Sequence, residues 1–150
     1  MLESFNEETS AKEEVKRADH LIYVTLKYTR TADVIHNTIK RLASAFEMCF
    51  EKILEDYKRQ KKIKEVPRTG YEKALLLETL MKNDKKMMDY ISFYLMLREI
   101  RRSEYIGKEE YRKHVTLISK DFRIKTDFLK ELFETTKRFV AYCDEKYKND

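Results

Sequence analysis

The chain has 150 residues, of which 42% are apolar and 39% are charged, and its net charge is +5. This length suits one domain with a real core, and the apolar content is unlike that of a disordered chain. Only two glycines and one proline are present, which favours long helices and nearly excludes the usual glycine-rich nucleotide loops. We therefore expect one all-α domain over residues 1–150, an antiparallel up-and-down four-helix bundle with long helices.

The cellular compartment is predicted from the absence of membrane-spanning, targeting and paired-cysteine patterns in the sequence. No apolar run approaches the roughly 20 residues that a membrane-spanning helix requires, and the acidic, polar start does not resemble a targeting segment. Cys49 and Cys143 have no paired spacing, so we interpret them as small buried apolar residues of a reduced protein. These features predict a cytoplasmic protein that does not bind a membrane.

Residues 1–9 are predicted to be a frayed leader that precedes the first helix. Thr9 or Ser10 can cap that helix, and Glu13 follows Ser10 at the spacing of a capping box. Apolar residues one turn apart then extend the helical pattern to about Tyr28.

A break is expected near Thr29–Thr31. The two threonines are good N-caps, and Asp33 suits the start of a helix. Because neither glycine nor proline occurs between Ser10 and Val66, one continuous helix is the alternative.

The second helix has the clearest pattern in the chain. Its apolar residues alternate in steps of four and three, which keeps one seam facing a partner helix. The helix ends in a lysine-rich run before the loop Glu65–Gly70, where Pro67 cannot continue a helix. The seam consists of Ile35, Ile39, Leu42, Phe46, Cys49 and Ile53.

The third and fourth helices are predicted from similar stripes. The third extends from about Tyr71 to Ser103, with polar residues at Asn83 and Asp84, and the fourth continues after Gly107 to about Tyr147. Because the first helix is shorter than the others, part of the long seam would stay uncovered in a monomer. A homodimer would cover it, so a homodimer is expected.

A metal site is the first candidate functional site. Di-metal helical bundles carry Glu-x-x-His on two helices, which aims both ligands inward one turn apart. The nearest pattern here is Asp33-x-x-His36, with Glu110 and His114 one turn apart further on. A second Glu-x-x-His is missing, and the third histidine, His20, belongs to a different face. We therefore expect neither a metal nor another cofactor.

Ordinary catalysis is not indicated, because no serine or cysteine has a glycine elbow or a neighbouring base.

Arg98 is of more interest, since it falls on the inner stripe of the third helix. A buried arginine requires an acceptor, and Asp84, Asp121 or Glu47 from facing helices would serve. A structural ion pair is favoured here over a ligand-binding role.

The basic run between the second and third helices is a candidate nucleic-acid-binding site. Clustered cations bind phosphates by releasing counterions, without any motif, although lysines also stabilise helix C-termini. Tyr57 and Tyr71 are the nearby aromatic residues, so nonspecific RNA contact is the most that the pattern predicts. The candidate residues are Lys58, Arg59, Lys61, Lys62, Lys64 and Arg68, followed by Lys82, Lys85 and Lys86.

Arg30 and His36 enclose five residues, and this spacing resembles the Arg-x(4–6)-His motif of HEPN helical bundles. The resemblance implies an intracellular, often dimeric bundle; some members are ribonucleases, and others bind partners or nucleotidyltransferases. The family's motif usually lies near the junction of the third and fourth helices, whereas here it opens the second. That junction carries Arg98 and His114 instead, and it also resembles archaeal helical proteins to which we attach no function.

Two functions are carried forward from these observations. The first is a helical interaction module that binds another macromolecule, a protein or nonspecific RNA, without catalysis. The alternative is a HEPN-like RNA-binding protein or metal-independent ribonuclease. In that case the resemblance implies that Arg30 and His36, or Arg98 and His114, polarise a ribose 2′-hydroxyl and a phosphate.

Overall fold

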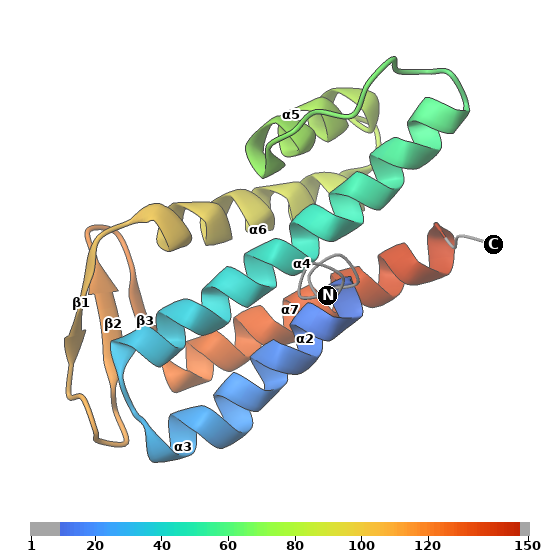
Figure 1. Cartoon of the computed structure of the whole chain (residues 1–150). Coiled ribbons are helices and arrows are strands. Elements are labelled where there is room, and N and C mark those ends of the chain that lie inside the picture. Colours follow the sequence, from blue (N-terminus) through green and yellow to red (C-terminus); the bar gives the residue numbers. More distant parts are fainter. Residues whose placement is uncertain (1–9, 148–150) are drawn as a thin grey trace, which may run out of the picture.

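A computed structural model describes residues 10–147 and combines helices with a small antiparallel sheet (Figure 1). The predicted all-α four-helix bundle is therefore wrong. Three short strands occupy the region where the third and fourth helices were expected to meet. The predicted frayed leader, residues 1–9, lies outside the described residues. Among residues 10–147, none of the helices combines the length and apolar character needed to cross a membrane.

The first helical run is unbroken from Ala11 to Tyr28 and contains a wider π-helical turn near its end. The hydroxyl of Ser10 accepts a hydrogen bond from the backbone N–H of Glu13 at 3.2 Å, which confirms Ser10 as the N-cap. The three consecutive pieces are α2 (Ala11–His20), η1 (Leu21–Thr25) and α3 (Leu26–Tyr28).

The predicted break near Thr29–Thr31 is confirmed. Thr29 leaves the helical conformation, with φ −130° and ψ 83°. Thr31 then caps α4 (Ala32–Arg59), because its hydroxyl accepts a hydrogen bond from the N–H of Val34 at 3.3 Å. A carboxylate oxygen of Glu110 accepts a second one from the N–H of Ala32 at 2.8 Å. Two of the N–H groups that a helix start leaves without an intrahelical partner thereby gain acceptors.

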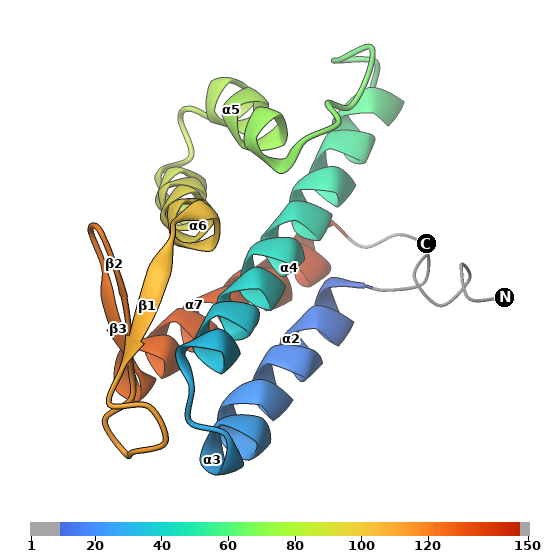
Figure 2. The same cartoon turned by 60° about the vertical axis from the view of Figure 1, so that its left-hand side comes forward.

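Helix α4 is the centre of the molecule. α2, α5, α6, α7 and the sheet all pack against it (Figures 1 and 2). In its middle, the ring of Phe46 stacks on Phe139 of α7 (Thr126–Lys146) with centroids 4.4 Å apart. The predicted seam is confirmed as core, since all six of its residues are buried.

The third predicted helix is in fact two helices, α5 (Gly70–Leu80) and α6 (Lys85–Arg102). They are separated by a turn in which Asp84 caps α6 by accepting a hydrogen bond from the N–H of Met87 at 3.0 Å. The polar pair at this position therefore ends one helix and starts another, because an aspartate competes with the helix for backbone donors.

The loop before α5 is confirmed, with Thr69 as the cap of the new helix and Gly70 as its first residue. Helix α5 packs on α4 within the same chain. Phe50, Ile53 and Leu54 of α4 are accordingly fully buried. The uncovered seam from which a homodimer was expected does not exist in this part of the chain, and dimerisation itself stays a prediction.

The sheet replaces the first part of the predicted fourth helix. Its strands are β1 (Tyr105–Lys108), β2 (Thr116–Ser119) and β3 (Arg123–Lys125), in that order and antiparallel. Leu117 pairs with Ile124 and both are fully buried against the helices. The fourth helix was expected soon after residue 107, but α7 begins only at Thr126.

Candidate functional site

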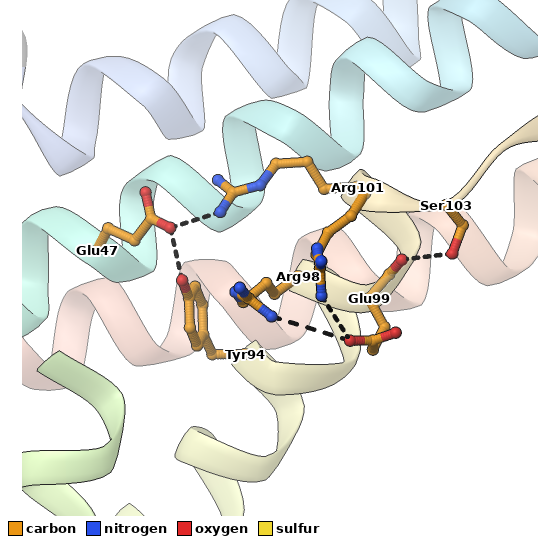
Figure 3. A network of polar contacts seen from close by, with 7 residues as sticks. Glu47, Tyr94, Arg98, Glu99, Arg101 and Ser103 are labelled. Carbon is orange, nitrogen blue, oxygen red and sulfur yellow. Dashed lines mark hydrogen bonds and ion pairs between the residues drawn. The ribbon is translucent and has the colours of Figure 1, made fainter. Parts of the chain in front are cut away.

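A polar network links α4 to α6 (Figure 3). One carboxylate oxygen of Glu47, Oε2, accepts hydrogen bonds from the hydroxyl of Tyr94 at 2.5 Å and from Nη2 of Arg101 at 2.7 Å. The side chains of Glu47 and Arg101 are 24% and 28% exposed. Tyr94 is fully buried. The carboxylate therefore satisfies two groups that would be costly to bury alone.

The surroundings of this network keep its two donors, Tyr94 and Arg101, protonated. Burial, and then the hydrogen bond to Glu47, raise the pKa of Tyr94 above its usual value. Burial alone would lower the pKa of Arg101, but the hydrogen bond to Glu47 and its charge outweigh burial and raise it. Because both donors stay protonated at neutral pH, the network suits structural cross-linking and not proton transfer.

Gly70 is fixed by the same network. A Cβ atom at this position would collide with Oε2 of Glu47 and with the hydroxyl of Tyr94. The start of α5 thus approaches the network closely enough that only glycine fits without displacing it.

Arg98 does not form the ion pair that the sequence suggested. Its guanidinium lies over the ring of Tyr71, 4.4 Å from the centroid, and its Nη1 is 3.9 Å from a carboxylate oxygen of Glu99. Glu47, one of its three expected partners, is used by Arg101 one turn further along α6. The guanidinium is therefore directed to α5, away from the sheet (Figure 3).

The Arg30 and His36 pair lies at the sheet end of α4. His36 donates from Nε2 to the carbonyl oxygen of Arg101 at 2.9 Å, since a carbonyl can only accept, and its ring stacks on Tyr105 at 4.5 Å. The carbonyl of Arg30 accepts a hydrogen bond from the N–H of Tyr111 at 2.6 Å. The imidazole is thus engaged in holding β1 against α4.

The remaining candidates do not complete a catalytic or metal cluster. His114 is exposed in the β1–β2 loop, and its carbonyl oxygen accepts a hydrogen bond from the hydroxyl of Thr116 at 2.8 Å. Asp33 accepts one from the hydroxyl of Tyr105 at 2.5 Å. Within residues 10–147, no three His, Cys, Asp or Glu side chains are placed to hold a metal ion.

The contact between Tyr105 and Asp33 leads to a prediction at alkaline pH. Burial, followed by this hydrogen bond, raises the pKa of Tyr105 from 10 to about 12. The native state therefore keeps the proton longer than the unfolded chain does. The stability that the contact supplies is complete below pH 10 and is lost as the pH rises from 10 to 12.

We expect the difference in unfolding free energy between the wild type and Tyr105→Phe to shrink over that interval, as measured by urea unfolding at several pH values. Tyr28→Phe, at a side chain that is 82% exposed, is the control and should leave the pH dependence unchanged. A Tyr105→Phe difference that stays constant from pH 8 to pH 12 would contradict the prediction.

The basic run occupies one end of the molecule, opposite the sheet (Figure 1). Tyr57, near the end of α4, and Lys85, at the start of α6, line one shallow hollow there. The end of α4, after which one lysine-rich segment follows, therefore lies beside the start of α6, which holds the other. Arg59 is paired with Asp56 at 3.1 Å and Lys62 lies 5.8 Å from the Tyr57 ring centroid.

Six cations at this end are exposed and form no ion pair within residues 10–147. We call them the basic end. They are Lys58, Lys61, Lys64, Arg68, Lys82 and Lys85.

Sequence reasoning missed the aromatic residues that α7 brings to the same end. Lys86 lies over the ring of Tyr142, 4.9 Å from the centroid, and Lys146 donates to the Tyr142 hydroxyl at 3.2 Å. Burial and the nearby Tyr142 raise the pKa of Tyr147 to about 12. The alternation of lysine and tyrosine in the last turns of α7 was the available signal, but its position beside α6 required the tertiary fold.

Comparisons of the chain with protein-family models, with curated proteins and with solved structures found no match. The geometry of the described residues is therefore the basis of the functional argument.

Proposed function

We propose that the chain is a noncatalytic interaction module that binds single-stranded RNA, without sequence specificity, through its basic end. The observation that carries this proposal is that the end of α4 and the start of α6, each next to a lysine-rich segment, line one hollow with Tyr57. Neither segment alone is distinctive, because basic helix ends are common. Their convergence concentrates positive charge on one surface, which is the main requirement for binding a phosphate backbone.

The chemistry of this surface fits single strands better than duplexes. Its cations are exposed and free of ion pairs within the described part of the chain, so phosphate contact would not first require breaking a salt bridge. Tyr57, Tyr142 and Tyr147 are half-exposed beside them. Aromatic rings next to cations allow bases of any identity to stack, which gives affinity without sequence preference.

The alternative, a HEPN-like ribonuclease, requires a free imidazole near an arginine. His36 instead donates to a backbone carbonyl and stacks on Tyr105. No specific contact favours cleavage over binding, so the proposal is binding. A cytoplasmic location and a homodimer stay predictions, and light scattering coupled to size exclusion measures the second of them.

RNA binding is tested by fluorescence anisotropy with a labelled single strand of about 20 nucleotides, titrated between about 50 and 200 mM salt. The triple variant Lys61→Gln, Lys64→Gln and Arg68→Gln should bind at least about tenfold more weakly at low salt. Its slope of log affinity against log salt should fall by about 2, since each lost contact with single-stranded RNA accounts for about 0.7.

The matched control removes three exposed cations from other surfaces, with the changes Lys27→Gln, Lys40→Gln and Lys137→Gln. It should retain most of the affinity and slope. An equal loss in both triple variants would show that net charge, and not the basic end, is responsible. RNA cleavage without metal, abolished by His36→Ala or by His114→Ala, would replace the proposal by the ribonuclease alternative.

A further inference from the structure

The two cysteines of the chain, Cys49 and Cys143, are 94 positions apart but meet in the fold. Cys49 belongs to α4 and Cys143 to the last turns of α7. Sγ of Cys143 lies 3.8 Å from the carbonyl oxygen of Cys49, and the two thiols are within hydrogen-bonding reach of each other. The packing of α7 on α4 has therefore created a dithiol, although neither residue has a partner nearby in the sequence.

This dithiol borders a cavity. The two side chains are only 4% and 1% exposed, but both line a cavity of about 650 Å³ beside the start of α2. At the rim of the cavity, the carboxylate of Asp144 binds Lys12 at 3.1 Å and Lys52 at 3.7 Å. The lining of this cavity thus includes the flexible, polar side chains of Lys12, Lys52 and Asp144.

The electrostatic surroundings make the two thiols unequal. The hydrogen bond from Cys49 lowers the pKa of Cys143, against the opposing effect of burial, and the positive charge of Lys52 acts in the same direction. The same hydrogen bond, together with burial, raises the pKa of Cys49. Because Lys52 lowers the pKa of both thiols, the hydrogen bond between them is what favours Cys143 as the thiolate, with Cys49 as its protonated partner. A thiolate next to a second thiol is the arrangement of redox-reactive pairs.

We propose that Cys49 and Cys143 form a peroxide-sensitive site that closes to an intramolecular disulfide between α4 and α7. The Cys143 thiolate attacks the O–O bond of a hydroperoxide, which forms an S–O bond and releases an alcohol, or water from hydrogen peroxide. The thiol of Cys49 then loses its proton and attacks the resulting sulfenic sulfur, which forms the S–S bond and releases water. Two electrons pass from the two thiols to one peroxide.

The product would join two helices whose cysteines enclose most of the chain. A cross-link over so long a segment stabilises a fold chiefly by restricting the unfolded chain. This inference is independent of RNA binding, since it concerns other residues and a covalent readout.

The experiment treats the reduced full-length protein with hydrogen peroxide under native conditions and measures intact mass and free thiols. We expect a mass lower by two hydrogens, the loss of both thiols, no link between chains, full reversal by dithiothreitol and a higher Tm. Two free thiols after a treatment that fully oxidises glutathione would overturn the proposal, and so would a disulfide found only between chains.

Single variants assign the order of the two steps. Cys49→Ala should accumulate a sulfenic acid at Cys143 that dimedone traps, whereas Cys143→Ala should leave Cys49 unlabelled. Lys52→Gln, at a partly exposed position outside the core, should slow oxidation several-fold without preventing it. Equal dimedone labelling of the two cysteine variants would contradict the assigned order.

Discussion

Replacing Phe46 with alanine is expected to lower the free energy of unfolding by about 3 to 5 kcal/mol. The side chain is fully buried in the middle of α4 and stacks on Phe139 at 4.4 Å. It also lies against Phe50 and Tyr94, with ring centroids 6.0 and 6.1 Å away. Alanine would leave a cavity between three helices that cannot close without moving α4, so both the transfer term and the cavity term apply.

This loss would be a large part of the about 5 to 15 kcal/mol that stabilises a typical domain. Urea unfolding followed by circular dichroism measures it. Tyr28→Ala, at an aromatic side chain that is 82% exposed, is the control and should change stability by less than about 0.5 kcal/mol. A loss below about 1 kcal/mol for Phe46→Ala would mean that the aromatic cluster does not form the core.

The second large effect is expected at Glu47. Glu47→Leu removes the only acceptor that the hydroxyl of Tyr94 and the guanidinium of Arg101 share within the described residues. Removing one partner of a buried pair costs about 3 to 5 kcal/mol. Because water reaches part of this network, we expect about 2 to 3 kcal/mol.

A double-mutant cycle separates the network from simple loss of packing. Adding Arg101→Met to Glu47→Leu should restore part of the stability, since an unpaired cation is then no longer half-buried. Glu13→Ala serves as the control, because the pair of Glu13 with Lys16 is exposed and 3.9 Å long; it should cost less than about 0.5 kcal/mol. Strictly additive effects of the Glu47 and Arg101 changes would show that the two side chains are not coupled.

The parts of the fold that could be predicted were those fixed by local chemistry. The helical spacing of the seam continues from Ile35 to Ile53, which is too long for a strand. Thr31 indicates the start of α4, because a threonine hydroxyl can cap a helix. The loop at Pro67 follows from a ring that cannot donate a hydrogen bond. In each case the decisive interaction lies within a few residues of the signal.

The sheet could not be predicted, because its usual signals are missing. Its strands have three or four residues, too few to show alternation, and Glu109 and Tyr111 adopt positive φ of 54° and 66° where glycine or asparagine is normal. The glycine, Gly107, lies within β1 instead of the turn. Val115 and Ile118 are three residues apart, which is a helical step, but in an extended chain such residues point to opposite faces, and here Val115 is buried and Ile118 half-buried.

Prediction of the site residues was limited in the same way, because their contacts depend on tertiary packing. Arg98 and Arg101 both fall near the inner face of α6, and which of them reaches Glu47 depends on the rotation of a helix that begins at Lys85 rather than Tyr71. The basic run was visible in sequence, but its meeting with Lys85 was not. The proximity of Cys49 and Cys143 likewise depends on how α7 docks, which no spacing encodes.

The central position of α4 also implies that the outer helices open locally with different free energies. Each outer helix can detach from α4 while the others still cover the rest of it, so partial opening need not melt the whole molecule. α5 buries Ala74 and Leu77, fewer residues than α6 or α7 bury, and should therefore open more often than either of them. Amide protons around Phe46 are shielded from every side, and their exchange with solvent would await global unfolding.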